Sequence, residues 1–333
     1  MKKYLFILLF SYSLIFSQEI IGGVGIAGQP LMNYVTINYK PSSTLSYNDA
    51  RDVMYSIIDL QDDNTLKGIY TNYTITIDPS QDPRPQTNAL NMNCEHAWPQ
   101  SMGASGSPQK SDLHHLYPTR ENVNSSRGNK PYADINDNDT DTWWRFDYYE
   151  TSIPNEFIDE FSEVDNDNEK FEPREDVKGN IARSMFYFYT MYNEAADQNF
   201  FDQQKEVLFE WHKNDPVDEI EYERTWSIAE YQEDKPNPYV IDSTLVRRIW
   251  FEEDSGPNLF FSESAEGTSN NKYLEIYNPT EETIYLSDFA FASAANDVDV
   301  PGQYEYWNEF DPGSQIAPGD VFVIAHPEAD TAI

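Results

Sequence analysis

The sequence predicts an α+β protein in two parts, a mainly helical domain followed by an all-β region. Apolar and amphipathic helical segments dominate the chain up to residue 252. Residues 258–333 instead show short runs of alternating polar and apolar residues punctuated by Gly and Pro, which is the pattern of strands. A length of 333 residues agrees with two domains of about 150 residues each.

Composition and charge exclude several classes of protein. A hydrophobic fraction of 39% with 15% aromatic residues is enough for a buried core and argues against a disordered chain. The 22 basic and 58 acidic residues give a net charge of −36, which repels polyanions. The overall field therefore does not hold this protein on nucleic acid or on an anionic membrane. One cysteine, Cys94, excludes an intrachain disulfide.

Residues 1–17 have the composition of a signal peptide. Lys2 and Lys3 precede an apolar run over 4–16, and Ser17 is a small residue at a plausible cleavage point. The run is shorter than the ~20 residues of a transmembrane helix. We expect a secreted protein, extracellular or periplasmic, with no membrane span; an N-terminal anchor helix is the alternative.

The first predicted elements of the mature chain are a helix and a strand. Residues 43–60 carry a helical apolar stripe, and Ser46 or Asn48 can cap its beginning. The stripe consists of Val53, Met54, Ile57 and Ile58. Residues 70–78 alternate polar and apolar side chains with many β-branched and aromatic residues, which predicts a strand.

The middle of the domain mixes ambiguous and acidic segments. Residues 91–98 fit neither period clearly, and Pro99 ends them. A short helix is expected from about Thr119 to near Gly128. Acidic stretches follow at 134–142 and 162–176, and the first is expected to be a loop.

The rest of the domain is predicted to be helical. A strongly apolar helix at 179–194 is expected to be buried on most sides, and three further helices complete the domain, at 200–213, 216–232 and about 241–251. The domain is taken as residues 18–252, with a linker at 253–257.

One stretch, residues 94–130, concentrates the groups that perform chemistry. Three of the five histidines lie there, together with carboxylates, carboxamides and cations. Residues 94–132 hold 4 basic and 3 acidic residues, so this stretch is locally neutral to positive in a very acidic chain. A phosphodiester can be tolerated at such an island.

Phosphodiester hydrolysis needs a base and a hard cation. An imidazole such as that of His96 suits the base, and Glu95 with Asn124 can supply oxygen ligands to the cation. Arg127 or Lys130 could hold a phosphate. Adjacent residues of a strand point to opposite faces, so Glu95 and His96 reach one site only at a strand end or bulge.

Three blocks of sequence carry a family resemblance. NCEHAWPQS, SDLHHLYPTRENVNSSRGNKPY and FEPREDVKGNIARSMFYFYTMY follow in that order, and over roughly residues 43–250 the chain resembles the bacterial endonuclease I family. The resemblance implies a secreted or periplasmic nuclease with a ββα-metal active-site motif. Such nucleases cut DNA, and often RNA, with little sequence preference, leaving 5′-phosphate and 3′-hydroxyl ends.

The same resemblance implies residue roles. His96 becomes the general base, and Glu95 with Asn124 become the ligands of one Mg²⁺ whose other positions hold water; Mn²⁺ or Ca²⁺ are expected substitutes. Arg127 matches the arginine that follows the ligand asparagine. The loop after His96 is short and lacks an arginine that some members carry, and Lys110 is the nearest substitute by position.

The other histidines and a buried arginine have weaker assignments. His114 is expected to orient the site by hydrogen bonds, and His115 is compatible with the surface. Zinc held by His96, His114 and His115 is the rival metal site, although no Cys pair or His-Glu helical motif supports it. Arg183 lies in an apolar helix and is expected to pair with a carboxylate beneath the site.

The acidic loop at 134–141 spaces its oxygens as calcium loops do. It lacks the glycine at position six and the glutamate at position twelve, where Arg145 stands. A solvated loop is the favoured interpretation, and a structural Ca²⁺ is the alternative.

The C-terminal region resembles a lamin-tail domain, an immunoglobulin-like β-sandwich, over residues 258–333. The stretches LFFSESAEGTSNNKYLEIYNPTEETIYLSDF and IAPGDVFVIAH carry the resemblance. Further strands normally follow, so we expect an incomplete sandwich. Its 14 acidic residues against one basic residue argue against nucleic-acid binding, and its partner cannot be identified from the sequence.

Together these observations predict a secreted, magnesium-dependent, sequence-nonspecific endonuclease, expected to be a monomer, with nucleic acid as its substrate. The alternative is an inactive nuclease fold that serves as a cell-surface or adhesion module through its β-sandwich. A zinc phosphodiesterase acting on small esters is a third hypothesis.

Overall fold

The structure is a computed structural model that describes residues 20–22, 26–251 and, with gaps at 269, 281–282, 287–288, 294–305 and 327, residues 259–329. The predicted signal peptide (1–17) and linker (253–257) lie outside the described residues. Contacts divide the chain into two compact units, one containing residues 28–252 and the other residues 253–333. The mixed α+β class and the strand-rich C-terminal region are confirmed.

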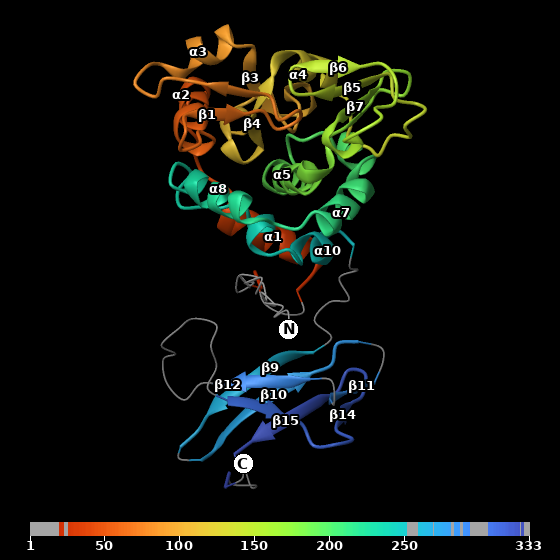
Figure 1. Cartoon of the computed structure of the whole chain (residues 1–333). Coiled ribbons are helices and arrows are strands. Elements are labelled where there is room, and N and C mark those ends of the chain that lie inside the picture. The colour runs from red at the N-terminus through yellow and green to blue at the C-terminus, as the bar shows by residue number, and fades with distance from the viewer. Residues whose placement is uncertain are drawn as a thin grey trace, which may run out of the picture. The chain divides into compact units, whose positions relative to one another are not determined.

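The first unit contains both helices and short strands (Figure 1). Its α-helices are α1 (Gly28–Tyr39), α2 (Tyr47–Val53), α3 (Pro83–Ala89), α4 (Glu121–Arg127), α5 (Lys178–Tyr192), α6 (Gln198–Asp202), α7 (Lys205–Asn214), α8 (Glu219–Ala229), α9 (Pro238–Ile241) and α10 (Leu245–Trp250). A π-helix, η1 (Met54–Ile58), continues α2, and short 3₁₀ turns include η3 (Gln109–Ser111) and η4 (Leu113–His115).

The strands of this unit form three small antiparallel sheets. Two are hairpin-like pairs, β1 (Thr65–Lys67) with β2 (Thr74–Thr76), and β3 (Met92–His96) with β4 (Leu116–Arg120). The third sheet has the order β6-β5-β7-β8, built from β5 (Thr142–Arg145), β6 (Tyr148–Glu150), β7 (Ser162–Asp165) and β8 (Lys170–Glu172).

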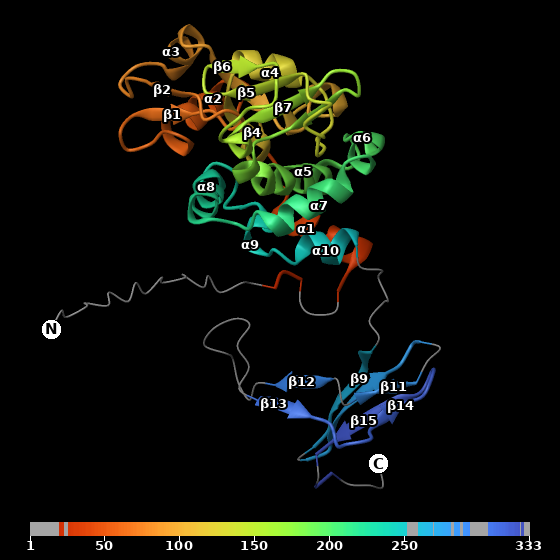
Figure 2. The ribbon, with the colours of Figure 1, turned by 45° about the vertical axis from the view of Figure 1, so that its right-hand side comes forward.

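The apolar helix α5 is the centre of the unit. In two views it runs beneath the strands, and α1, α7, α8 and α10 lie on its other side (Figure 1, Figure 2). Nearly all its side chains are buried, as the sequence predicts. Trp98, which directly follows the strand β3, stacks on Phe188 of α5 with ring centroids 4.8 Å apart. This packing anchors the end of β3 to the core.

The predicted helix at 43–60 is capped as expected, and three of its four stripe residues, Val53, Met54 and Ile58, pack in the core. Ser46 caps α2 by accepting a hydrogen bond from the backbone N–H of Asp49. The last turn widens into the π-helix η1, which rotates the side chains that follow. Ile57 of the predicted stripe is consequently 54% exposed, whereas Tyr55 is only 1% exposed.

The main error of the sequence prediction lies in the acidic middle of the domain. The four-stranded sheet occupies residues 142–172, where acidic stretches were expected. All four residues of β7 are buried, including Glu163 and Asp165, so charged residues stand at positions that a strand pattern would give to apolar ones. Helix α1 was also not predicted, and the predicted strand at 70–78 is reduced to β2.

Two of the predicted C-terminal helices of the unit are divided. The segment 200–213 becomes α6 and α7, separated at the buried Gln204, whose side chain accepts a hydrogen bond from the backbone of Tyr132. Of the segment 241–251, only Ile241 belongs to a first helix, α9, and Leu245–Trp250 form α10; between them Asp242 accepts from the backbone N–H of Thr244. Side-chain bonds to the backbone thus end these helices early.

The second unit consists of strands in the part that the structure describes. These are β9 (Phe260–Glu266), β10 (Lys272–Tyr277), β11 (Ile284–Tyr285), β12 (Ala290–Ser293), β13 (Tyr306–Glu309), β14 (Gln315–Ile316) and β15 (Val321–Ala325). A three-stranded antiparallel sheet has the order β15-β10-β9, and two pairs, β11-β14 and β12-β13, accompany it. Its buried core is small, with Ile276, Leu286 and Ile316 at the centre.

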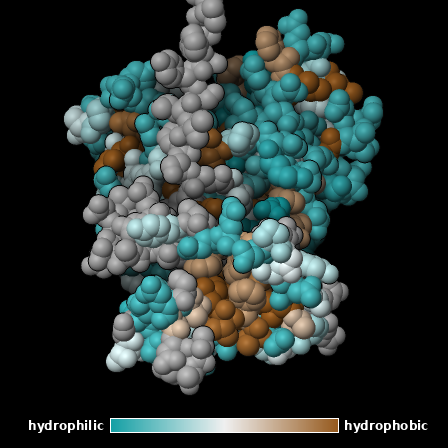
Figure 3. Space-filling view, turned by 90° about the horizontal axis from the view of Figure 1, so that it is seen from below, coloured by the Kyte–Doolittle hydropathy of each residue, from teal (hydrophilic) through white to brown (hydrophobic). Residues whose placement is uncertain are grey.

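Apolar surface is also part of this unit. Phe260, Phe261 and Val323 are between 41% and 55% exposed. Seen from below, apolar atoms gather most clearly near the lower edge of the picture, and smaller apolar areas lie elsewhere among hydrophilic ones (Figure 3). Among the described residues no helix has the length and apolar character needed to cross a membrane.

Candidate active site

The candidate site is built from β3, β4 and α4, which follow one another as strand, strand and helix. β3 and β4 pair antiparallel, with Glu95 opposite Tyr117 and His96 opposite Leu116. α4 begins directly after β4 and ends at Gly128, close to the predicted bounds. Asn124 and Arg127 are three residues apart on α4, and both contact β3.

Glu95 is buried, with 1% of its surface exposed. One carboxylate oxygen, Oε1, accepts the hydroxyl of Tyr70 at 2.8 Å and lies 3.3 Å from the guanidinium of Arg127. The other oxygen, Oε2, accepts no hydrogen bond from any described residue. Burial raises the pKa of Glu95 to about 7, while the charge of Arg127 and the hydrogen bond from Tyr70 oppose that rise.

Asn124 is oriented by two hydrogen bonds from its amide nitrogen. Nδ2 donates to Oδ1 of Asn93 at 2.8 Å and to the backbone oxygen of Cys94 at 3.2 Å. Both bonds use the amide nitrogen. The amide oxygen, Oδ1, accepts no hydrogen bond from a described residue. Asn93 and Glu95 are two residues apart on β3 and therefore share one face of the strand.

These two oxygens fit a hard divalent cation. A carboxylate oxygen of Glu95 and the carboxamide oxygen of Asn124 each accept no hydrogen bond from a described residue, while the other polar atom of each group is held. Asn124 is held through Asn93, which shares a face of β3 with Glu95. Mg²⁺ is typically bound by one or two such ligands and keeps several waters. No group of three or more His, Cys, Asp or Glu residues in the described part of the chain is placed to hold a metal, so the zinc alternative finds no ligand cluster there.

His96 is the last residue of β3, the strand end that the sequence argument requires. Its Nε2 lies 3.1 Å from the backbone oxygen of Lys110. A carbonyl oxygen can only accept, so Nε2 carries the proton and Nδ1 carries the lone pair. Burial, and then the charge of neighbouring His115, lower the pKa of His96 to about 3, so the imidazole is neutral at pH 7.

Glu95 and His96 contact different neighbours despite the strand end. The His96 ring lies 5.5 Å from the ring of Tyr47 and 5.4 Å from that of His115. Glu95 instead faces Tyr70 and Arg127. No hydrogen bond or ion pair between described residues joins the imidazole to the carboxylate, as expected for neighbours on a strand.

Arg127 is buried between α4 and the end of β3. It is 1% exposed, and its guanidinium donates to the backbone oxygens of His96 and Ala97 and pairs with Glu95. The guanidinium also lies 4.7 Å from the ring centre of Tyr132. These contacts tie α4 to the end of β3, and such burial leaves no open face for the phosphate that the sequence argument assigned to Arg127.

Of the two lysines named from the sequence, the structure brings one to His96. The Lys110 ammonium lies 4.8 Å from the ring centre of Tyr47, the ring that neighbours His96. The Lys130 ammonium donates to the backbone oxygen of Ser126, near the end of α4, and its backbone N–H donates to the backbone oxygen of Arg127.

His114 and His115 lie in positions other than those expected from the sequence. His114 is buried and bonds through Nε2 to the backbone oxygen of Lys235, away from Glu95 and His96. His115, thought compatible with the surface, is fully buried and is the histidine beside His96. It is held by a 2.7 Å bond between Nε2 and the backbone oxygen of Gln109.

Arg183 has the carboxylate partner that its buried position requires. It forms a two-pronged pair with Glu221 of α8, at 2.7 Å and 2.5 Å. Both side chains are buried. The pair joins α5 to α8, and no contact links Arg183 to Glu95 or His96 within the described residues.

The acidic loop at 134–141 uses its first carboxylate structurally. Oδ1 of Asp134 accepts the indole N–H of Trp211 at 2.7 Å and lies 3.2 Å from the Lys178 ammonium. Asp137 and Asp139 are exposed. The structural Ca²⁺ considered for this loop thus has no cluster of acidic ligands in the described residues.

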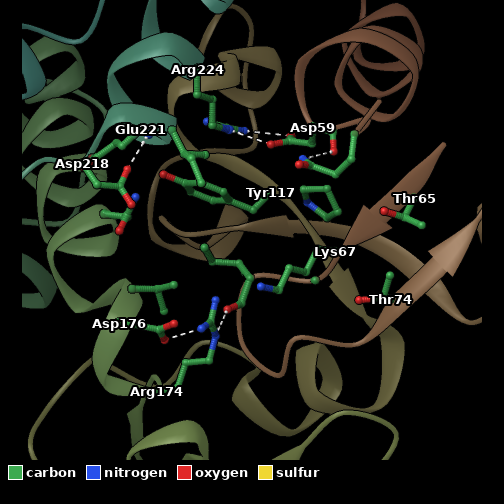
Figure 4. Close-up of a pocket in the computed structure, with 17 residues that line it drawn as sticks. Asp59, Thr65, Lys67, Thr74, Tyr117, Arg174, Asp176, Asp218, Glu221 and Arg224 are labelled. Atoms are coloured by element: carbon green, nitrogen blue, oxygen red, sulfur yellow. Dashed lines mark hydrogen bonds and ion pairs between the residues drawn. The ribbon is translucent and has the colours of Figure 1, made fainter. Parts of the chain in front are cut away.

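A cavity of about 300 Å³ lies elsewhere, lined by residues of β1, β4 and α8 (Figure 4). Its arginines are neutralised, Arg224 by Asp59 and Arg174 by Asp176. Lys67 also lines it and makes no ion pair with a described residue. None of the residues named for the site from the sequence lines this cavity.

Sequence reasoning missed the residues that surround Glu95 and His96 from distant segments. Tyr70 and Tyr132 join their hydroxyls at 2.6 Å beside Glu95, and Tyr47 packs beside His96. All three are ordinary aromatic residues in a chain with 23 tyrosines, so nothing in the pattern marks them. Asn93 could have been found, since it stands two residues before Glu95.

Comparison with known proteins shows the family of this chain. A family model described as Endonuclease I matches residues 29–244, and the chain belongs to that family. A protein of Bacillus subtilis (strain 168) named extracellular ribonuclease is 30% identical over 178 residues, which are 49% of this chain and 55% of that protein. One of the same name from Bacillus amyloliquefaciens is 30% identical over 173 residues, 47% and 53% of the two chains. The chain thus spans about half the length of these relatives.

Proposed function

We propose that this protein is a secreted, magnesium-dependent endonuclease that hydrolyses phosphodiester bonds of DNA and RNA with little sequence preference. The observation that carries the proposal is the pair of unengaged oxygens, Oε2 of Glu95 and Oδ1 of Asn124, on the strand–strand–helix unit of an Endonuclease I family member. We assign this unit as the ββα-metal motif. The printed name of the two relatives supports RNA as one of the substrates.

Glu95 and Asn124 would hold the cation. When bound, Mg²⁺ neutralises charge on the reacting phosphate and stabilises the leaving 3′ oxygen. Tyr70 and Arg127 occupy Oε1 of Glu95, so the carboxylate presents Oε2. Asn93 occupies the amide nitrogen of Asn124, so the carboxamide presents Oδ1. Each ligand is therefore oriented before the metal arrives.

His96 is the proposed general base. Its Nδ1 would take a proton from the attacking water as the new P–O bond forms, and the bond between phosphorus and the 3′ oxygen breaks. The leaving 3′ oxygen takes up a proton from solvent, so the fragment upstream of the cut ends in a 3′-hydroxyl and the downstream fragment carries the 5′-phosphate. A pKa of about 3 makes the free imidazole a weak base. A negatively charged phosphodiester beside the ring favours the imidazolium form and raises its pKa towards the working range.

Secretion is proposed on two observations. Residues 1–17 have the pattern of a signal peptide, and both relatives are named extracellular. The strand-rich C-terminal unit is proposed to be a lamin-tail-like, immunoglobulin-like sandwich that accompanies the enzyme as an accessory domain, with a partner still to be found. Its antiparallel sheet β15-β10-β9 supports a β-sandwich architecture.

Digestion of three substrates tests the proposal. Plasmid DNA, single-stranded DNA and RNA are each incubated with the full-length secreted protein in Mg²⁺, Mn²⁺, Ca²⁺, Zn²⁺ or EDTA. We expect nicking and degradation with Mg²⁺, activity with Mn²⁺ or Ca²⁺ as substitutes, and none in EDTA. Undiminished cutting in EDTA would remove the metal from the proposal. No cutting under any condition would favour an inert fold with a role in adhesion.

A further inference from the structure

Two cations lie close to the ring of Tyr47, the ring that neighbours His96. The guanidinium carbon of Arg51 lies 4.5 Å from the ring centre, and the ammonium of Lys110 lies 4.8 Å from it. Tyr47 and Arg51 are one turn apart on α2, whereas Lys110 comes from the turn η3. Segments 59 residues apart in the sequence therefore bring two positive charges to one aromatic ring.

Neither cation is neutralised by a carboxylate. Arg51 donates from Nη2 to Oδ1 of Asn48 at 2.7 Å, and neither Arg51 nor Lys110 makes an ion pair with any described residue. Most other arginines of this unit are paired with acids, namely Arg84, Arg127, Arg145, Arg174, Arg183, Arg224 and Arg248. In a chain with 58 acidic and 22 basic residues, two unpaired cations at one place form an uncommon positive spot.

This spot lies next to the proposed base. The His96 ring is 5.5 Å from the Tyr47 ring, and the backbone oxygen of Lys110 is the atom that holds Nε2 of His96. The residue whose carbonyl fixes the histidine tautomer thus also supplies one of the two charges. Tyr47, Arg51 and Lys110 are each half-buried, so part of each side chain lies at the surface.

We propose that Arg51 and Lys110, both held against the ring of Tyr47, form a phosphate-binding clamp for the nucleic-acid backbone beside His96. The ligand is a phosphodiester group adjacent to the one being cut. Charge-assisted hydrogen bonds from a guanidinium and an ammonium suit phosphate oxygens, and the cation–π contacts preorganise both side chains. This inference rests on the proposed nuclease function, and it gives an acidic protein a local means of holding a polyanion.

Neutral variants test the clamp through binding and through kinetics. Arg51→Gln and Lys110→Gln are prepared with Lys67→Gln as the matched control, because Lys67 is an unpaired cation on the far cavity and its loss changes the net charge equally. Binding of a fluorescein-labelled single-stranded oligonucleotide is followed by anisotropy in EDTA at several salt concentrations, and KM and kcat are measured with Mg²⁺.

We expect each clamp variant to raise KM about tenfold with kcat little changed, because a contact of this kind binds ground state and transition state alike. The slope of log K against log[salt] should fall in magnitude by about 0.7 per lost phosphate contact. Arg51→Lys should restore most of the slope because it keeps the charge. Lys67→Gln should leave both quantities unchanged.

Several results would overturn the clamp. Clamp variants that match the wild type in KM and slope would do so, as would equal losses in Lys67→Gln, which would indicate only a general field effect. A loss confined to kcat, with binding intact, would also contradict it. If the wild type still cuts nucleic acid in Mg²⁺, these results contradict the clamp but not the proposed nuclease function. A wild type that does not cut contradicts the proposed function itself.

Discussion

At the residue scale, the ligand orientation of Glu95 depends on two tyrosines. Tyr70 donates to Oε1 of Glu95 and also bonds the hydroxyl of Tyr132 at 2.6 Å. Both tyrosines are fully buried. Their hydroxyls therefore have no water to replace a lost partner, and the position of Glu95 should respond to small changes in this network.

Replacing Tyr70 with Phe should weaken Mg²⁺ binding about tenfold while the fold remains intact, because Glu95 loses the hydroxyl that fixes its orientation. Isothermal titration calorimetry with Mg²⁺ measures this directly. Tyr73→Phe is the control: it removes a hydroxyl that bonds the backbone of Leu90 instead. Equal Mg²⁺ affinity in Tyr70→Phe and wild type would show that the network does not position the ligand.

The pH dependence of metal binding should follow Glu95. Burial raises its pKa to about 7 in the metal-free protein, and only the ionised carboxylate binds the cation. Apparent Mg²⁺ affinity should therefore rise about tenfold per pH unit below 7 and level off above it. His96, with its pKa lowered by burial, is already neutral across this range and adds no step. An affinity that is flat between pH 5.5 and 8.5 would contradict the assignment of Glu95.

At the scale of elements, the sequence predicts the features that depend on neighbouring residues and misses those that depend on distant segments. The cap at Ser46, the end of α4 at Gly128 and the burial of α5 each depend on residues within a few positions. The four-stranded sheet at 142–172 depends on pairing between segments whose acidic residues hide the strand period.

The same distinction between local and distant contacts applies to the candidate site. Glu95, His96 and Asn124 stand in contiguous motifs and could be named from the sequence. Tyr70, 25 residues before Glu95, contacts it only in the folded chain. In the same way, Arg51 and Lys110 come together at the ring of Tyr47 only in the folded chain. No single-sequence pattern encodes such contacts.

The ion pair between α5 and α8 supports the helices beneath the strands. Glu221→Gln should lower the free energy of unfolding by about 3 kcal/mol, because it leaves the buried Arg183 without its counter-charge. Urea denaturation measures the change. Glu223→Gln, at an exposed position of the same helix, is the control and should have almost no effect. A loss of similar size in both variants would assign the effect to helix α8 itself.

At the scale of the whole molecule, the net charge of −36 and the proposed substrate are reconciled by a local exception. In the proposed function, the site would supply a cation pair and hold a metal, while the acidic rest of the chain would repel the nucleic acid. A nuclease of this kind should bind its substrate weakly and neutralise few phosphates.

The salt dependence of the reaction should therefore be modest. A plot of log(kcat/KM) against log[NaCl] at fixed Mg²⁺ should have a slope of about −1 to −2 on single-stranded DNA, as expected for two or three phosphate contacts. The rates are measured on the full chain at NaCl concentrations between about 50 mM and about 300 mM. A slope of about −5 or steeper would require an extended basic surface and would contradict this account.

The most direct test of the central claim is plasmid cleavage by His96→Ala beside the wild type, with Mg²⁺ affinity measured on both proteins. The account predicts that cleavage falls by about 10²–10⁴-fold, the usual contribution of a general base. Mg²⁺ affinity and thermal stability should stay close to wild type, because Glu95 and Asn124 are untouched. Cleavage at the wild-type rate by a folded, metal-binding His96→Ala protein would contradict the account.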